Sequence, residues 1–282
     1  MNSPFHRPTR FELIYQREIN RLLDKFFVLP SAQTLGEINQ RMVEFSQLRN
    51  FIQGSAARLA AKMVTMVAQG NSRSWRQAAT KASKGRFIYN MLKRELQGGL
   101  GDRIAGIVQS NAEYISTLPN NIAERTTSYI QRETMKGRRS EDIMKDIKPY
   151  MQHLKNYEVQ RIARTEVAKT DTAITRVRAE SIGLNWYEWE TSHDARVRPS
   201  HKIMNGVLIN WNDPPSPESL AHEKSVGHYH AGEIYNCRCP ALPVLSLSGL
   251  SWPHKVYIHG SIKRLSRKDF LLVSGIPLQL VA

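Results

Sequence analysis

Apolar side chains recur every three or four residues through most of the first 135 positions, which is the spacing of amphipathic helices. The pattern predicts helices over the segments 11–27, 35–69, 87–96, 104–115 and 122–135. Proline and glycine supply the expected helix ends, which are Pro30, Gly70 with Asn71, the Gly98–Gly99 pair, Pro119 and Gly137. We therefore predict a region in which helix packs against helix.

Two more helices are predicted before the pattern changes. Ser140 and the two acidic residues after it have the features of an N-cap and a first helical turn, and this short helix is expected to end near Pro149. From Lys155 the spacing predicts one long amphipathic helix, with Gly183 at its C-terminal end.

Beyond residue 183 the pattern favours strands. The segments NWYEWET (185–191) and GVLINW (206–211) have the aromatic content or alternation of strands, and KVYIHG (255–260) is a weaker third candidate. The tail over 246–282 has apolar runs broken by glycine and proline around a basic SIKRLSRKD. We predict that it covers the domain as a peripheral strand or helix; the alternative is a docking segment for another protein.

Together these elements predict an α+β fold class. A mostly α-helical N-terminal region is expected over residues 1–155, followed by a small α+β domain with a long helix and a short sheet over 156–245, and the tail over 246–282.

The charge of the chain is positive and unevenly distributed. The formal net charge is +15, of which +11 lies in residues 1–160 and +4 in residues 161–282. A basic domain attracts polyanions such as nucleic acid through its phosphates, although a dispersed basic surface that only faces solvent is the alternative. The charge makes nonspecific contact with double-stranded DNA a candidate function of the N-terminal half.

Several protein classes are excluded by composition. No window approaches the roughly 18 to 20 consecutive apolar residues of a membrane helix, and the first residues lack a secretory signal, so we expect no membrane partner and synthesis in a cytosol. The two cysteines, Cys237 and Cys239, are one residue apart and cannot form a disulfide scaffold.

The residues with candidate chemistry gather in the last third of the chain. Seven of the nine histidines and both cysteines follow residue 190, and the candidate group lies in TSHDARVRPSH and HYHAGEIYNCRC. Thiolates and neutral imidazoles are the ligands that Zn²⁺ prefers in a tetrahedral site, so a structural zinc site is one interpretation. The other is that the cysteines are small half-buried residues and the histidines polar loop residues. No set of nucleophile, base and orienting residue is evident, so no catalytic residue is predicted.

Motifs over residues 161–240 resemble a known family. RIARTEVAKTDTA on the long helix is followed in order by WYEWETSHDARVRPSH, an MNG turn, DPP and GEIYNCRCP. In this order and spacing they are similar to the phage Mu protein F-like minor head protein family, also called the phage head-morphogenesis family. The matching positions are Arg164, Thr165, Glu166, Asp194, Arg196, His201, Gly206, Cys237, Arg238 and Cys239.

This resemblance implies a virion protein and not an enzyme. It implies a minor capsid protein in the phage head interior or at the portal vertex, assembled in the host cytoplasm. The implied partners are the portal protein, other head proteins and double-stranded DNA, and the implied roles are head morphogenesis and DNA packaging or ejection. A basic N-terminal half fits sequence-independent contact with the phosphate backbone.

The resemblance also bears on the metal. Some family members have a fuller Cys/His set, with cysteines where this chain has Arg198 and His201 and a histidine where it has Ile234. His201, Cys237 and Cys239 remain as candidate zinc ligands, and a fourth ligand would come from Asp194, His193, His230 or water.

A network of charges is the alternative to the metal. Asp194, Arg196 and Arg238 could hold the same loops through bidentate hydrogen bonds, with Arg164 and Glu166 pairing with them or with each other.

Two further functional classes compete with a head protein. A metal-dependent nuclease would need an open coordination position and an activated water, and we find no supporting His-Asn-His or carboxylate cluster. A cellular nucleic-acid-binding regulator would need a recognition motif, and neither a helix-turn-helix pattern nor zinc-knuckle spacing is present. Metal-dependent DNA cleavage or sequence preference would identify these classes.

Overall fold

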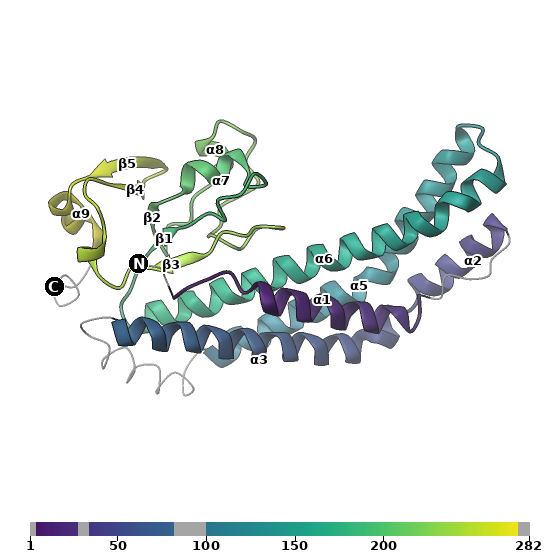
Figure 1. The fold of residues 1–282 in the computed structure, drawn as a ribbon, viewed down its shortest axis with the longest axis horizontal. Helices are drawn as coiled ribbons and strands as arrows, with labels where there is room; N and C mark the ends of the chain where they lie inside the picture. The colour runs from purple at the N-terminus through teal and green to yellow at the C-terminus, as the bar shows by residue number, and fades with distance from the viewer. Residues whose placement is uncertain (1–3, 28–33, 82–99, 276–282) are drawn as a thin grey trace. The chain divides into compact units, whose positions relative to one another are not determined.

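The computed structural model describes residues 4–27, 34–81 and 100–275 and is drawn in Figure 1. Its helices are α1 (Thr9–Asp24), α2 (Leu35–Ser46), α3 (Arg49–Lys81), α5 (Leu100–Met135), α6 (Ser140–Ser181), α7 (Pro199–Met204), α8 (Pro217–Leu220) and α9 (Arg267–Ser274). Its strands are β1 (Trp186–Trp189), β2 (Val207–Asn210), β3 (Ala241–Pro243), β4 (His254–Ile258) and β5 (Ser261–Leu265), with a 3-10 helix, η2 (Leu247–Gly249). The predicted α+β class is confirmed.

The chain divides into two compact units. The helical unit contains residues 9–65 and 104–166, and the sheet unit contains residues 1–8, 66–103 and 167–282. Because α3 and α6 contribute residues to both ranges, each of these helices crosses from one unit to the other. α6 also continues without a break through residue 155, where the sequence predicted a boundary.

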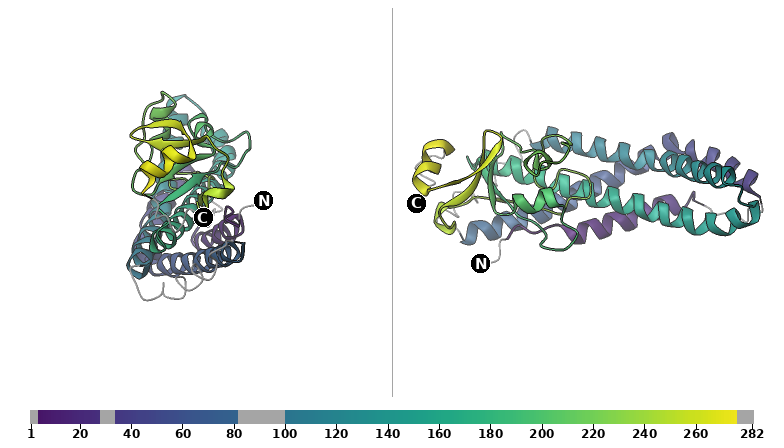
Figure 2. Two further views of the ribbon diagram at one scale, coloured as in Figure 1. Left: turned by 90° about the vertical axis from the view of Figure 1, so that its left-hand side faces the viewer. Right: turned by 90° about the horizontal axis from the view of Figure 1, so that it is seen from above.

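The helical unit is built from α1, α2, α5 and the first parts of α3 and α6. Figures 1 and 2 show α1 running beside α5 and the first part of α6. Tyr15, Ile19 and Leu23 of α1 are buried at a spacing of four residues, so they form one apolar face of that helix. At the edge of this packing the buried Lys155 of α6 pairs with Asp24 of α1. No helix in the described part of the chain has the length and apolar content needed to cross a membrane.

Two predicted helix ends are wrong because each proline lies inside a longer helix. Pro119 is inside α5 and Pro149 is inside α6, so each joins two helices that the sequence had separated. A proline inside a helix removes one backbone hydrogen bond and costs about 3 kcal/mol. Leu118 and Ile122 are fully buried around Pro119, and this packing offsets the cost.

The predicted end at Gly70 and Asn71 is also wrong, since α3 continues through both residues to Lys81. The helix predicted over 35–69 is instead interrupted between α2 and α3, where Gln47 is the C-cap of α2. The ends predicted at Gly137 and Gly183 are confirmed, because both glycines adopt the positive φ that ends a helix. The helix predicted over 87–96 and the ends at Pro30 and Gly98–Gly99 lie outside the described residues.

Asn71 lies inside a helix because its side chain is fully used there. Its Nδ2 donates to Asp171 Oδ1 (2.8 Å) and Thr175 Oγ1 (2.6 Å) of α6, and its Oδ1 accepts from Arg178 Nη1 (2.7 Å). Arg178 also donates to Ser72 Oγ (2.8 Å). Within the sheet unit these bonds join α3 to the last part of α6 and pair a buried guanidinium.

The sheet has the strand order β3-β1-β2-β4-β5, with β2 and β4 parallel and the other neighbours antiparallel. The three predicted strands are confirmed as β1, β2 and β4. β3 and β5 were not predicted, because β3 has only three residues and β5 lies in the basic SIKRL segment. The described tail forms β4, β5 and α9, and β4 lies inside the sheet between β2 and β5, so the tail is part of the sheet and not only a peripheral cover; its docking role stays a prediction.

Apolar side chains cover both faces of this sheet. Tyr187 and Trp189 of β1 belong to a cluster that includes Trp75 of α3 and Ala179 of α6. The opposite face carries a second cluster, formed by Trp186, Leu208, Leu247, Val256 and Phe270. The sheet is therefore buried at its centre, and the functional candidates lie at the end of β1.

The buried network around Asn71 predicts the effect of its loss. Asn71→Ala removes three side-chain hydrogen bonds from groups that stay away from water, so we expect the free energy of unfolding to fall by about 2–4 kcal/mol. Chemical denaturation measures this change. The control is Asn120→Ala, also in a helix, which removes an exposed bond to Glu124 (2.8 Å) and should change stability by less than about 0.5 kcal/mol. Equal losses in the two variants would contradict this role of Asn71.

Candidate metal centre

Two loops carry the candidate ligands, and both meet β1 at the same end. The first loop leaves β1 at Trp189, forms α7 and turns into β2, where Gly206 N donates to Trp189 O (2.8 Å). The second loop runs from α8 to β3, and β3 pairs with β1 so that Ala241 lies opposite Trp189. His201 of α7 and the two cysteines before β3 therefore reach the same end of the sheet.

The structure brings together the three residues predicted as metal ligands. His201, Cys237 and Cys239 are 3 %, 3 % and 5 % exposed. His201 Nδ1 lies 3.7 Å from Cys237 Sγ and 3.5 Å from Cys239 Sγ, and the three ligand atoms all lie within 4.8 Å of one another. Among the residues that the structure describes, this is the one group of three or more His, Cys, Asp or Glu side chains whose ligand atoms lie close enough together to hold a metal ion.

These distances fit a tetrahedral metal ion. With Zn–S near 2.3 Å and Zn–N near 2.0–2.1 Å, tetrahedral geometry places a sulfur and a nitrogen about 3.6 Å apart. The two observed N···S distances of 3.7 and 3.5 Å lie on either side of that value. Two thiols and one imidazole also form the donor set that zinc prefers. The residues present can therefore hold zinc with three of four ligands.

The two thiols have different acidities. Hydrogen bonding with Cys239 is the main cause that lowers the pKa of the Cys237 thiol well below its ordinary value. The neighbouring Cys237 sulfur and burial raise the pKa of the Cys239 thiol. A bound zinc ion would hold both sulfurs as thiolates.

On its other side the His201 ring contacts residues that sequence reasoning missed. His201 Nε2 lies 3.0 Å from the Tyr229 hydroxyl, and Tyr229 donates to Glu218 Oε1 (2.6 Å). Ser200 also donates to Glu218 Oε1 (3.4 Å). Burial and the Glu218 carboxylate raise the pKa of Tyr229 above its ordinary value, so the phenol keeps its proton. Tyr229 and Glu218 lie outside any metal-ligand spacing, and no sequence signal marked them.

The charge network proposed as the alternative to a metal is present beside the cluster. Arg238 is 8 % exposed and pairs with both carboxylate oxygens of Asp194, with Nη2 2.6 Å from Oδ1. The backbone N–H of Arg196 donates to Asp194 Oδ1 (2.9 Å), and its exposed guanidinium lies 3.7 Å from Oδ2. The Arg238 guanidinium holds the pKa of the Asp194 carboxyl well below its usual range. The charge network therefore lies beside the three candidate metal ligands.

Arg198 makes a further contact between the same two loops. Its Nη2 donates to the backbone oxygen of Tyr235 (2.8 Å), and its guanidinium lies 4.5 Å from the centre of the Tyr235 ring. This is a cation–π contact as well as a hydrogen bond. Arg198 therefore links the two loops by a hydrogen bond and a cation–π contact.

The side chains considered for the fourth ligand are engaged elsewhere. His193 pairs with Glu190, and Asp194 pairs with Arg238. His230 Nδ1 lies 3.2 Å from the Tyr187 hydroxyl, and its Nε2 lies 3.4 Å from Arg176 Nη1. None of these side chains belongs to the group of ligand atoms around His201, so water is the candidate that remains.

Two glycines allow these loops to lie where they do. Gly206 has a φ of +71° at the turn between α7 and β2, a conformation that side chains disfavour. Gly232 has a φ of +86°, and a Cβ there would lie 2.5 Å from Thr172 Oγ1 of α6. Thr172 also donates to the Ala231 carbonyl (2.7 Å), which fixes the second loop on the last part of α6.

Three positions of the family motif lie in the other unit. Arg164, Thr165 and Glu166 belong to the helical unit, and Arg164 Nε donates to Glu12 Oε1 of α1 (3.1 Å). Burial, followed by the charge of Glu166, raises the pKa of Tyr15 above its ordinary value. The pairing of Arg164 with Glu12 was not indicated by the sequence.

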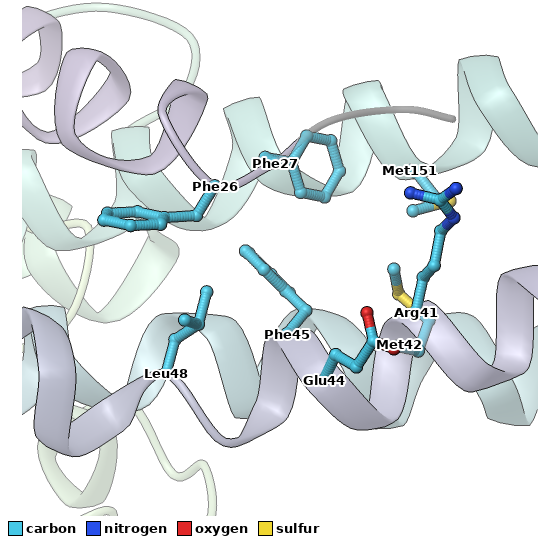
Figure 3. A pocket seen from close by; sticks show the side chains of 8 residues that line it. All are labelled: Phe26, Phe27, Arg41, Met42, Glu44, Phe45, Leu48 and Met151. Carbon is cyan, nitrogen blue, oxygen red and sulfur yellow. The ribbon is translucent and has the colours of Figure 1, made fainter. Parts of the chain in front are cut away.

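A cavity in the helical unit offers no comparable chemistry. It has a volume of about 220 Å³ and is shown in Figure 3. Its lining is apolar apart from two charged side chains: Phe26, Phe27, Arg41, Met42, Glu44, Phe45, Leu48 and Met151. The chemical candidates of the chain therefore remain those at the end of β1.

A curated relative matches about half of this chain. A protein of Haemophilus influenzae (strain ATCC 51907 / DSM 11121 / KW20 / Rd), described as "Uncharacterized protein", is 25 % identical over 144 residues. The match covers 51 % of this chain and 30 % of that relative, so the chain matches less than a third of the relative's length. No solved structure matches.

The family comparison covers the segment that holds the site. The sequence model of the family described as "Phage Mu protein F like protein" matches residues 124–242. This segment runs from α5 to β3 and contains the His201–Cys237–Cys239 cluster and the Asp194–Arg238 pair. Residues 124–242 of this chain are therefore similar to the phage Mu protein F like family.

Proposed function

We propose that this protein is a minor head protein of a tailed phage that acts in head morphogenesis at the portal vertex and is not an enzyme. The family match over residues 124–242 carries the proposal, since this family suggests a head-morphogenesis protein. Burial of His201, Cys237 and Cys239 supports a structural role for the cluster, because a catalytic metal must be reached by its substrate. The proposed partners are the portal protein and other head proteins, and the proposed location is the virion.

Phage particles from a strain that carries the gene test this proposal. We expect the protein in purified heads, at fewer copies than the major capsid protein, and co-isolated with the portal. Disruption of the gene should lower the yield of infectious particles while cell lysis continues. Quantitative mass spectrometry measures the copy number of the protein, and plaque titration measures the yield of infectious particles. Particles that lack the protein and remain fully infectious would contradict the proposal.

Contact with packaged DNA is the second part of the proposal, and α3 supports it. This helix has six Lys or Arg residues in 33 positions and no Asp or Glu. Arg58, Lys62, Arg73 and Arg76 are exposed and are spaced 4, 11 and 3 residues apart. In an ideal helix, at about 100° per residue, this spacing corresponds to about 60° around the helix axis. We call these four residues the α3 stripe.

The stripe has few local counter-charges. Lys62 Nζ lies 3.4 Å from Glu18 Oε2, but within the described residues Arg58, Arg73 and Arg76 form no ion pair. Exposed cations with few acidic neighbours attract phosphates, and such contact is independent of sequence. We therefore assign the proposed DNA contact to this face.

Replacement of the three unpaired arginines tests the assignment. We expect Arg58→Gln, Arg73→Gln and Arg76→Gln together to weaken duplex binding more than about tenfold at about 50 mM salt. The slope of log affinity against log salt should also fall by about 2 to 3, because each lost phosphate contact contributes about 0.9. Fluorescence anisotropy over a salt series measures both quantities.

A second triple variant with the same charge change is the control. Arg132, Lys136 and Lys145 are exposed and each lies within 4.0 Å of a carboxylate, at 3.6, 2.8 and 3.3 Å. Their replacement by glutamine should leave the slope near that of the unmodified protein, since acidic neighbours already compensate them. Equal losses in the two triple variants would show that net charge alone, and not the α3 stripe, determines binding.

The third part of the proposal is that His201, Cys237 and Cys239 hold a structural zinc ion. When bound, zinc would supply coordination bonds that tie α7 to the loop before β3. The support is the donor set and the N···S distances of 3.7 and 3.5 Å. Arg238 with Asp194, and Arg198 with Tyr235, link the same loops by charge and hydrogen bonds.

Elemental analysis of the purified protein tests the zinc site. We expect about one zinc ion per chain, and a melting temperature that chelation lowers by more than about 5 °C. Cys237→Ser should lose the metal. His193→Ala is the matched control, because His193 is a loop histidine paired with Glu190 and should keep the full zinc content. A metal-free protein whose melting is unaffected by chelators would contradict the zinc site.

A further inference from the structure

The contacts of His201, Tyr229 and Glu218 determine where protons lie. His201 Nε2 is 3.0 Å from the Tyr229 oxygen, and the Tyr229 hydroxyl donates to Glu218 Oε1 at 2.6 Å. A phenol has one proton to donate, and a carboxylate can only accept. Because that proton points at Glu218, the Tyr229 oxygen must accept a proton from His201 Nε2. The remaining ring nitrogen, Nδ1, is the atom that faces the two sulfurs.

Glu218 is placed to strengthen this chain of bonds. Its side chain is buried, and its Oε2 has no hydrogen-bond partner among the described residues. The carboxylate charge is therefore compensated mainly through Oε1, by Tyr229 and Ser200. A buried acceptor with few partners polarises the donor that it has, and the effect passes along the chain to the imidazole.

We propose that Glu218 and Tyr229 are positioning residues that keep the proton of His201 on Nε2 and so reserve Nδ1 for a metal ion. The claim about the proton concerns the protein without metal, whereas the claim about metal affinity rests on the zinc site proposed above. Residues that orient a metal-binding histidine in this way usually change metal affinity by 10- to 100-fold.

A second tyrosine–histidine pair in the sheet unit has the opposite arrangement. His230 Nε2 lies 3.4 Å from Arg176 Nη1, and a guanidinium can only donate, so this nitrogen must accept. Burial and the charge of Arg176 lower the pKa of His230 to about 4, which keeps the ring neutral at neutral pH. His230 therefore carries its proton on Nδ1, which faces the Tyr187 hydroxyl at 3.2 Å. His230 is therefore an internal control for the measurement of the proton position on His201.

The proton positions are measured on the full-length, metal-free protein. Long-range ¹H–¹⁵N correlation spectra of ¹⁵N-histidine-labelled protein distinguish a protonated Nε2 from a protonated Nδ1. We expect His201 with a proton on Nε2 and His230 with its proton on Nδ1. A His201 ring protonated only on Nδ1 would overturn the proposal. This spectrum is recorded on the unmodified protein, so no variant is needed.

Zinc affinity of matched variants tests the second claim. We expect Tyr229→Phe to weaken zinc binding by about 10- to 100-fold in competition with a chromophoric chelator. Tyr187→Phe removes the other buried tyrosine hydroxyl that contacts a histidine, and it should change the affinity less than about threefold. Glu218→Gln keeps a side-chain oxygen that can accept from Tyr229, so we expect its loss of zinc affinity to lie between those of Tyr187→Phe and Tyr229→Phe. If Tyr229→Phe does not fold, Glu218→Gln takes its place as the test.

The outcomes separate this proposal from the zinc site itself. Unchanged affinity in Tyr229→Phe and Glu218→Gln would overturn the positioning role. A protein that binds no zinc but protonates His201 on Nε2 would contradict the zinc site and support the proton assignment. Weakened binding in Tyr229→Phe, with Tyr187→Phe unchanged, would support both claims.

Discussion

The sheet unit depends on a junction between two polar loops at one end of β1. Each loop brings polar groups to this junction: a buried imidazole and two buried thiols in one place, and the partly exposed carboxylate of Asp194 with the buried guanidinium of Arg238 in another. Buried polar groups need hydrogen-bond or charge partners. His201 contacts the thiols of Cys237 and Cys239, and Asp194 pairs with Arg238. Because each pair takes one member from each loop, the pairing also fixes the loops.

The ion pair and the sulfur cluster differ in whether they need a further partner. The Asp194–Arg238 pair is complete in itself, since both carboxylate oxygens meet guanidinium nitrogens. The sulfur cluster leaves one coordination position to a ligand that no described side chain supplies. Arg198 adds a direct bond between the same loops, to the backbone oxygen of Tyr235.

Much of the fold could be predicted from the sequence, and the errors have physical causes. Strands β1, β2 and β4 were found because their aromatic and β-branched residues fit a buried sheet. Local rules failed at Pro119 and Asn71, where buried neighbours compensate for a poor helix residue. The three candidate ligands were identified by residue type and family pattern. Tyr229 and Glu218 were not, because their role comes from proximity to His201 across 28 and 17 positions of the chain, which no spacing rule reports.

The central claim is that a metal ion joins α7 to the loop before β3 through one nitrogen and two sulfurs. X-ray absorption spectroscopy at the zinc edge measures that shell directly. The account predicts two sulfur neighbours near 2.3 Å, with nitrogen or oxygen near 2.0–2.1 Å completing four ligands. A zinc shell without sulfur, or one with four sulfur neighbours, would contradict it, because the described cluster supplies two sulfurs and one imidazole.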